Sequence, residues 1–181
     1  MLLQILTYTH HLTTMLFGIF LSAFFLGVKQ NKKNVCILLG GGAVSGLFFL
    51  ICNTVFGSLF TEAVYPIFVH LPLFLLLVFY YRFRWLPSII SIMTAYLCCQ
   101  FSNWAGIFAL SLSGLDWVYY LVRIIVTVAV FAFLSRYLCQ TTALLFAKSD
   151  RELYILGAMP FVYYVFDYST TKFLHASLLR K

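Results

Sequence analysis

Five polar side chains stand within apolar stretches of the sequence: His70, Gln100, Asn103, Arg123 and Asp167. A rise of about 1.5 Å per residue along the expected helices puts His70, Arg123 and Asp167 about 9 Å inside one face of a bilayer. Polar groups in lipid must face a bundle interior, pair with each other or line a wet cavity. The grouping predicts a ligand-binding pocket in one half of a helix bundle.

Each of these residues also has a structural alternative. Arg123 and Asp167, expected on neighbouring helices, could form an ion pair, or Arg123 could extend to the lipid headgroups. His70 could donate to carbonyl groups left free by a nearby proline. Gln100 and Asn103 share a helix face and could hydrogen-bond to another helix.

The sequence lacks the motifs of an enzyme or a metal site. It has no His-Glu-x-x-His or Gly-x-Ser-x-Gly pattern and no pair of carboxylates within an apolar stretch. The run GGGAVSG (40–46) lacks the Lys-Ser/Thr ending of a phosphate-binding loop, so it predicts close helix packing or flexibility. The cysteines are odd in number and mostly lie in apolar runs, which favours buried thiols over disulfides or zinc: Cys36, Cys52, Cys98, Cys99 and Cys139. We therefore expect no catalytic residue, no cofactor and no metal.

The composition is that of a membrane protein. Of 181 residues, 63% are hydrophobic and 9% are charged, which is more apolar surface than a soluble domain can bury. The net charge of +7 comes from short basic clusters between apolar runs, which argues against nucleic acid as a partner. At about 20 residues per span, the runs predict an all-α bundle of about six transmembrane helices, near 5–28, 35–56, 64–80, 86–110, 117–134 and 154–168. The third contains two prolines, and its outer end is expected to be kinked or irregular.

Basic residues give the expected orientation in the membrane. They fall in the first, third and fifth loops, which are therefore expected in the cytoplasm, with the N-terminus outside: Lys29, Lys32, Lys33, Arg82, Arg84, Arg136, Lys148 and Arg151. Aromatic rings near the expected interfaces agree with these boundaries: Trp85, Trp117, Tyr119, Tyr120 and Tyr154. Six spans would leave the C-terminus outside, although 172–181 is basic. We expect a bundle at 1–171 and a truncated or non-native tail at 172–181, unless the last run does not span.

The stretch KSDRELYILGAMPFVYYVFDYST leads from a charged turn into an aromatic-rich span with an early proline. It resembles the membrane sensor region that precedes GHKL-type ATPase domains in bacterial receptor histidine kinases of the accessory-gene-regulator type. The resemblance implies a bundle of six or seven helices in the bacterial cytoplasmic membrane that detects an extracellular signal, often a peptide. The chain has no phosphoacceptor box and no ATP-binding motif, and His175 has no acidic neighbour. The resemblance therefore implies a sensor module without its own kinase domain.

Two other functions are compatible with the same sequence. Substrate-binding subunits of energy-coupling-factor transporters have six helices and an outer-half cavity, but they are expected to keep the N-terminus in the cytoplasm. A membrane scaffold without a ligand is the third alternative. The expected partners are the lipid bilayer, an extracellular peptide or small molecule and a second copy of the chain.

Overall fold

The computed structural model describes residues 2–57, 60–61, 64, 66–147, 149–167 and 169–170, and this part of the chain contains helices and no strand. The elements are α1 (Leu2–Phe25), α2 (Lys32–Phe56), η1 (Pro66–His70), α4 (Leu71–Leu75), η2 (Leu76–Tyr80), α5 (Trp85–Ser113), α6 (Asp116–Tyr137), α7 (Cys139–Phe146) and α8 (Asp150–Asp167). The all-α prediction is confirmed for these residues. The expected basic tail, 172–181, and Lys148 lie outside them.

Three helices, α2, α5 and α6, are long and apolar enough to cross a membrane. The helix α1 has 24 residues but includes His10 and His11, and α8 carries three charged residues in its first turn. The apolar segment at 66–80 is shorter than a full span. The fold is that of a membrane protein, and the count of six spans stays a prediction.

The segment expected to be kinked is irregular. It is built from a π-helical turn (η1), a short α-helix with Pro72 at its start (α4) and a second π-helical turn (η2). Proline removes a backbone donor and clashes with the preceding turn, so regular α-helical bonding cannot run through this segment. The predicted irregularity near the prolines is confirmed, and η2 extends it to the other end of the segment.

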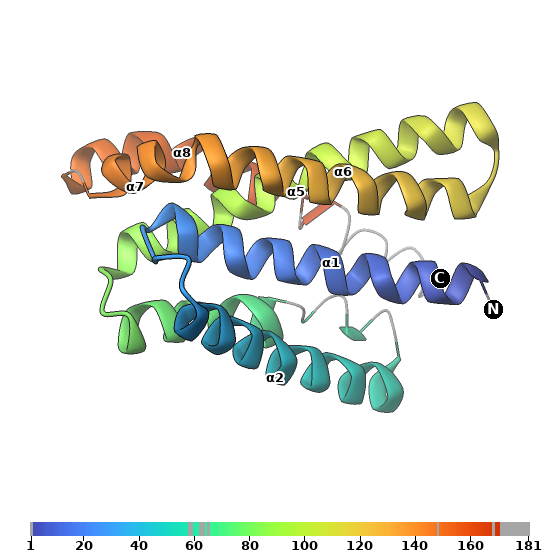
Figure 1. Cartoon of the computed structure of the whole chain (residues 1–181), viewed down its shortest axis with the longest axis horizontal. Helices are drawn as coiled ribbons and strands as arrows, with labels where there is room; N and C mark the ends of the chain where they lie inside the picture. The colour runs from blue at the N-terminus through green and yellow to red at the C-terminus, as the bar shows by residue number, and fades with distance from the viewer. Residues whose placement is uncertain are drawn as a thin grey trace.

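The helix α1 lies across the middle of the molecule and packs against α2, α5, α6 and α7 (Figure 1). Its second half forms much of the core, where Phe17, Phe20 and Phe24 contact Phe131 of α6. Small residues let the helices approach closely, because they leave room for a neighbour's side chain. A Cβ added at Gly42 would lie 3.2 Å from Ile19 Cδ1, which confirms close packing within the glycine-rich run.

Five of the buried residues of α5 are small: Ser88, Ser91, Ala95, Ser102 and Gly106. Ser91 Oγ donates a 2.5 Å hydrogen bond to the Ser22 carbonyl of α1, so α5 is in direct contact with the backbone of the neighbouring helix. From α8, a Cβ added at Gly157 would lie 2.7 Å from Ile90 Cδ1 of α5. The helix α5 is therefore held between partners by contacts that leave little space.

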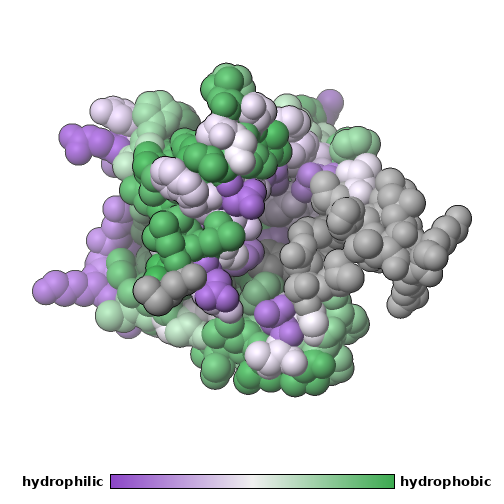
Figure 2. Space-filling model, turned by 90° about the vertical axis from the view of Figure 1, so that its right-hand side faces the viewer, coloured by the Kyte–Doolittle hydropathy of each residue, from purple (hydrophilic) through white to green (hydrophobic). Residues whose placement is uncertain are grey.

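The outer surface of the bundle is apolar. Large side chains of α2 and α8 are more than half exposed, among them Leu47, Phe48, Ile155 and Met159. Figure 2 shows hydrophobic residues along the upper and lower parts of the outline, with hydrophilic side chains projecting at its left edge. A soluble monomer does not expose apolar surface so widely. These side chains are placed to contact lipid, which supports the membrane assignment.

The connections between helices fall at two opposite ends of the molecule. Loops 26–31 and 81–84 and the α7–α8 connection lie at one end, and the N-terminus and the α5–α6 connection lie at the other (Figure 1). The same three connections line one cavity together. The described basic residues of these connections, Lys29, Arg82 and Arg84, are thus gathered at one end, which is called the basic end below.

Candidate functional site

Arg123 lies on α6, in the half of the bundle away from the basic end. Its Nη1 donates a 2.5 Å hydrogen bond to the hydroxyl of Tyr119, and its Cζ atom lies 5.1 Å from the centre of the Tyr119 ring. Residues four apart share a helix face, so this contact forms within α6 itself. The ring and the hydroxyl together hold the guanidinium in place.

The two amides predicted on α5 join this group. The Tyr119 hydroxyl lies 3.4 Å from Asn103 Oδ1, and Asn103 Nδ2 donates to Gln100 Oε1 at 3.2 Å. Gln100 and Asn103 therefore bond to each other and, through Tyr119, reach Arg123. These four residues are called the arginine cluster.

Gly106 of α5 leaves the space for the stem of Arg123. A Cβ at this position would lie 2.5 Å from Arg123 Cγ and 2.9 Å from Arg123 Cδ. No real side chain tolerates such distances without a shift, so α5 and α6 can pack closely here only because residue 106 has no side chain. The arginine cluster is built into the α5–α6 contact.

His10 of α1 lies next to the arginine cluster. It is 3% exposed, its ring centre is 5.9 Å from that of Tyr120, and its Nδ1 is 3.3 Å from Thr14 Oγ1. In the sequence, His10 falls near the start of the helix expected at 5–28. The structure buries it against α6, so it adds a polar group that the sequence-based list omits.

His70 and Asp167 belong to a second group, at the meeting point of η1, α5 and α8. His70 Nδ1 is 2.8 Å from the Tyr164 hydroxyl, and the Tyr96 hydroxyl donates to Asp167 Oδ2 at 2.5 Å. The rings of Tyr96 and Tyr164 meet edge to face with their centres 5.0 Å apart. These four residues are called the tyrosine cluster.

The alternative of an ion pair between Arg123 and Asp167 is not what the structure shows. Arg123 donates to Tyr119 and Asp167 accepts from Tyr96, and the ion pair seen among the described residues joins Arg84 to Asp150 at 3.1 Å. The physical reason is that α5 packs against both α6 and α8. Equal depth in the membrane therefore does not bring the two side chains together.

The two clusters are adjacent along α5, where Tyr96 and Gln100 are one turn apart. The five predicted residues are thus distributed over both groups, and tyrosine hydroxyls that the sequence analysis did not select join them. Their spacing carried a usable signal. Gln100 follows Tyr96 by four residues, and Asn103 follows Gln100 by three. Arg123 follows Tyr119 by four residues. Each of these tyrosines therefore shares a helix face with a polar residue.

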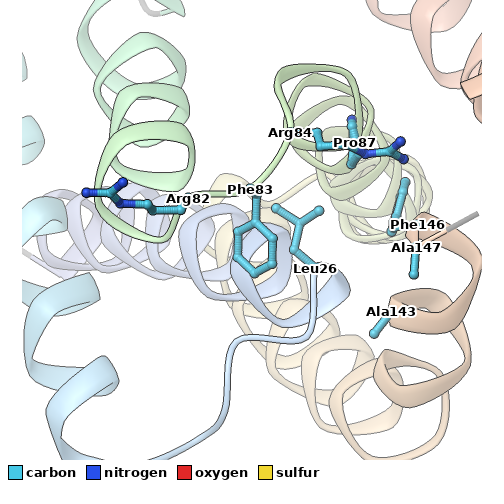
Figure 3. A pocket seen from close by; sticks show the side chains of 8 residues that line it. All are labelled: Leu26, Arg82, Phe83, Arg84, Pro87, Ala143, Phe146 and Ala147. Atoms are coloured by element: carbon cyan, nitrogen blue, oxygen red, sulfur yellow. The ribbon is translucent and has the colours of Figure 1, made fainter.

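Two cavities of about 200 and 210 Å³ lie elsewhere in the bundle. The first is at the basic end, where Leu26 and Phe83 lie side by side, Arg84 lies next to Pro87, and the Arg82 guanidinium points away from them (Figure 3). The second is apolar and is bounded by α1, α2 and the segment at 66–80. Neither cavity is lined by any of the five predicted residues.

Metal ligation has no support in the described part of the chain, where no three His, Cys, Asp or Glu side chains are placed to hold an ion. The five cysteines are all free, and Cys52 and Cys139 are buried as expected. Cys36 is exposed, which differs from the expectation of a buried thiol. It lies near the start of α2, at the basic end.

Comparison with protein-family models, curated proteins and solved structures gives no match for this chain. The fold therefore identifies the chain as an all-helical membrane protein and does not assign it to a narrower class. The resemblance to sensor regions of histidine kinases stays a prediction.

Proposed function

We propose that the chain is a membrane sensor module of a histidine-kinase type of signalling system, located in the bacterial cytoplasmic membrane with its N-terminus outside. It detects an extracellular ligand in the outer half of the bundle. One observation supports this most: polar side chains from α1, α5, α6, α8 and η1 converge in the half of the bundle opposite the basic end.

The positive-inside tendency supports the orientation. Basic loops of membrane proteins stay in the cytoplasm, and the basic connections of this chain lie together at one end of the bundle. The clusters at the other end would then face outward. Figure 2, which views the molecule from that end, shows hydrophilic residues toward its recessed middle and hydrophobic residues around them.

The tyrosine cluster offers a route from ligand to signal. It connects η1 and α5 to α8, and α8 includes most of the stretch that resembles kinase sensor regions. A ligand that bonds to His70 or Asp167 in competition with the tyrosines favours a different position of α8 against α5. Such a ligand shifts the equilibrium between the two positions of α8 by an amount set by its difference in affinity for them.

Thiol labelling in intact cells tests the orientation. In a background without the native cysteines, Ser113→Cys at the α5–α6 connection should react with a membrane-impermeant maleimide. Asn31→Cys at the basic end, the matched control, should react only after the membrane is permeabilised. The reverse pattern would contradict detection of an extracellular ligand, because the polar clusters would then face the cytoplasm.

Crosslinking between α5 and α8 tests the sensing step. Ile90 and Gly157 are in contact, so the double variant Ile90→Cys/Gly157→Cys, treated with a membrane-permeant oxidant that takes up the two electrons, forms a disulfide at a rate that depends on how the two helices meet. A sensor should change this rate when cells are moved from fresh medium to spent medium of a dense culture of the source organism. An unchanged rate would favour a scaffold.

A further inference from the structure

Arg123 is a cation without a carboxylate partner in the described part of the chain. It is the eighth residue of α6, and therefore lies about 10 Å from the start of that helix. A cation in such a position is destabilising unless it is paired or solvated. Arg84 at the basic end, by contrast, has Asp150 beside it.

Two polar atoms in this region are buried without a hydrogen-bond partner. They are Nε of Arg123 and Oγ1 of Thr127, and they are the buried side-chain atoms of the described residues for which this holds. Residues 123 and 127 are one turn apart on the same face of α6, and Thr127 is 2% exposed. Buried polar groups are normally bonded, so the two atoms mark a place where a partner is needed.

The chemistry of the two atoms specifies that partner. Nε–H is a donor, and the threonine hydroxyl donates as readily as it accepts. Of the five N–H donors of the guanidinium, one hydrogen bond, to Tyr119, is made within the described residues. An oxyanion that accepts from Nε, from a second guanidinium nitrogen and from the hydroxyl gives both unpartnered atoms a hydrogen bond.

A carboxylate fits this site better than a phosphate group does. One guanidinium balances one negative charge, and a planar carboxylate accepts two parallel N–H bonds from the guanidinium. The other members of the arginine cluster, Tyr119, Asn103 and Gln100, are neutral. A dianion would therefore leave one charge uncompensated in a poorly hydrated site.

We propose that Arg123 and Thr127 bind the carboxylate of the ligand, with Asn103 and Gln100 beside it. The inference rests on the proposed function in two respects, namely that the site faces the outside of the cell and that binding there serves sensing. The chemistry by which the site binds a carboxylate does not depend on either. The carboxylate belongs either to a small organic acid or to the C-terminus of a peptide.

Thermal unfolding of the purified chain in a neutral detergent tests the site, with two pairs of probes at constant ionic strength. The first pair is sodium benzoate and benzamide. The second is an N-acetylated apolar tetrapeptide with a free C-terminus and the same peptide amidated. We expect a saturable rise in the unfolding temperature with the charged member of at least one pair and none with its neutral counterpart. Benzoate alone indicates a small acid, and the peptide alone indicates a C-terminus.

Three variants assign the response to the site. Arg123→Gln should weaken binding about tenfold or more, because a charge-assisted hydrogen bond is lost. Thr127→Val, which has nearly the same shape, should weaken it about threefold. Arg136→Gln removes a cation from the last turn of the same helix and should leave binding unchanged. The unfolding temperature without a probe shows that each variant is folded.

Three outcomes would overturn the carboxylate site: no saturable response in the parent chain, an equal response to the neutral probes, or an unchanged affinity in both Arg123→Gln and Thr127→Val. The labelling experiment at Ser113 and Asn31 decides separately whether the site faces outward. A saturable response combined with reversed labelling would keep the carboxylate site and contradict the extracellular sensor.

Discussion

The two ends of the bundle hold arginine in different surroundings. At the basic end, Arg84 pairs with Asp150, and both side chains are at least half exposed to solvent. In the other half, Arg123 is bonded to a tyrosine and has a buried nitrogen without a partner among the described residues. Water and the Asp150 carboxylate stabilise the Arg84 charge independently of how the helices pack elsewhere. The stability of the second charge depends on the groups that the bundle places around it. We therefore propose that Arg84 helps to orient the chain in the membrane and that Arg123 binds the ligand.

The largest expected effect is on the space that holds Arg123. Gly106→Ala should lower the free energy of unfolding by about 1–3 kcal/mol, because the new methyl group would collide with Arg123. Gly40→Ala is the matched control, since a Cβ at that position meets no atom within 4 Å. Unfolding by sodium dodecyl sulfate titration measures both. Equal responses of the two glycines would contradict the close contact, and Arg123→Ala should rescue Gly106→Ala.

Removal of the unpaired charge should stabilise the chain when no ligand is bound. A cation at the centre of a membrane helix is unfavourable by about 2.5–3.5 kcal/mol, and the shallower position of Arg123 and its polar neighbours reduce this penalty. We expect Arg123→Gln to raise the free energy of unfolding by about 1–2 kcal/mol, measured by the same titration. A loss of stability would show that the guanidinium is a packing element, and would weaken the binding role.

The tyrosine cluster should make a smaller contribution. Tyr164→Phe removes the hydroxyl that lies 2.8 Å from His70 Nδ1, and should lower the free energy of unfolding by about 0.5–1.5 kcal/mol. Tyr154→Phe on the same helix is the control, because that side chain is exposed. If the two substitutions have the same effect, the bond between α8 and η1 contributes nothing measurable.

The smallest effect is expected at the basic end. Arg84→Gln removes a surface ion pair whose side chains are 50% and 60% exposed, so the free energy of unfolding should change by no more than about 0.5 kcal/mol. The same titration measures it. A change as large as that of Arg123→Gln would remove the contrast between the two ends.

The sequence predicts the helices well and their lateral contacts poorly. Apolar runs mark α2, α5 and α6 because hydropathy is a local property of the chain. Counting residues along a helix gives the depth of Arg123 and Asp167 but not which helix lies beside each of them. The ion-pair alternative fails for this reason, because α5 lies against both helices. The short helix α7 was also missed, because its eight residues fall within an expected loop.

The interpretation of the tyrosines shows a second limit. A ring with one polar edge near a span boundary is typical of the membrane interface, and Tyr119 is expected there from the sequence. The structure instead uses its hydroxyl to connect Arg123 to Asn103. Tyr96 and Tyr164 lie further inside their helices, and only their spacing from Gln100 and Asp167 indicates a polar role. Such spacing becomes informative once the packing partner of each helix face is known.

Thiol accessibility at residue 103 tests the central claim, that the polar half of the bundle is open to the outside and binds a ligand there. Asn103 is half-buried in the arginine cluster, whereas Ser22 is 1% exposed in the core and serves as the control. In intact cells without the native cysteines, a small membrane-impermeant thiol reagent should modify Asn103→Cys but not Ser22→Cys, and the carboxylate probe that stabilises the parent chain should slow the reaction. Modification of Asn103→Cys only after permeabilisation, or at a rate that the probe does not change, would contradict the account.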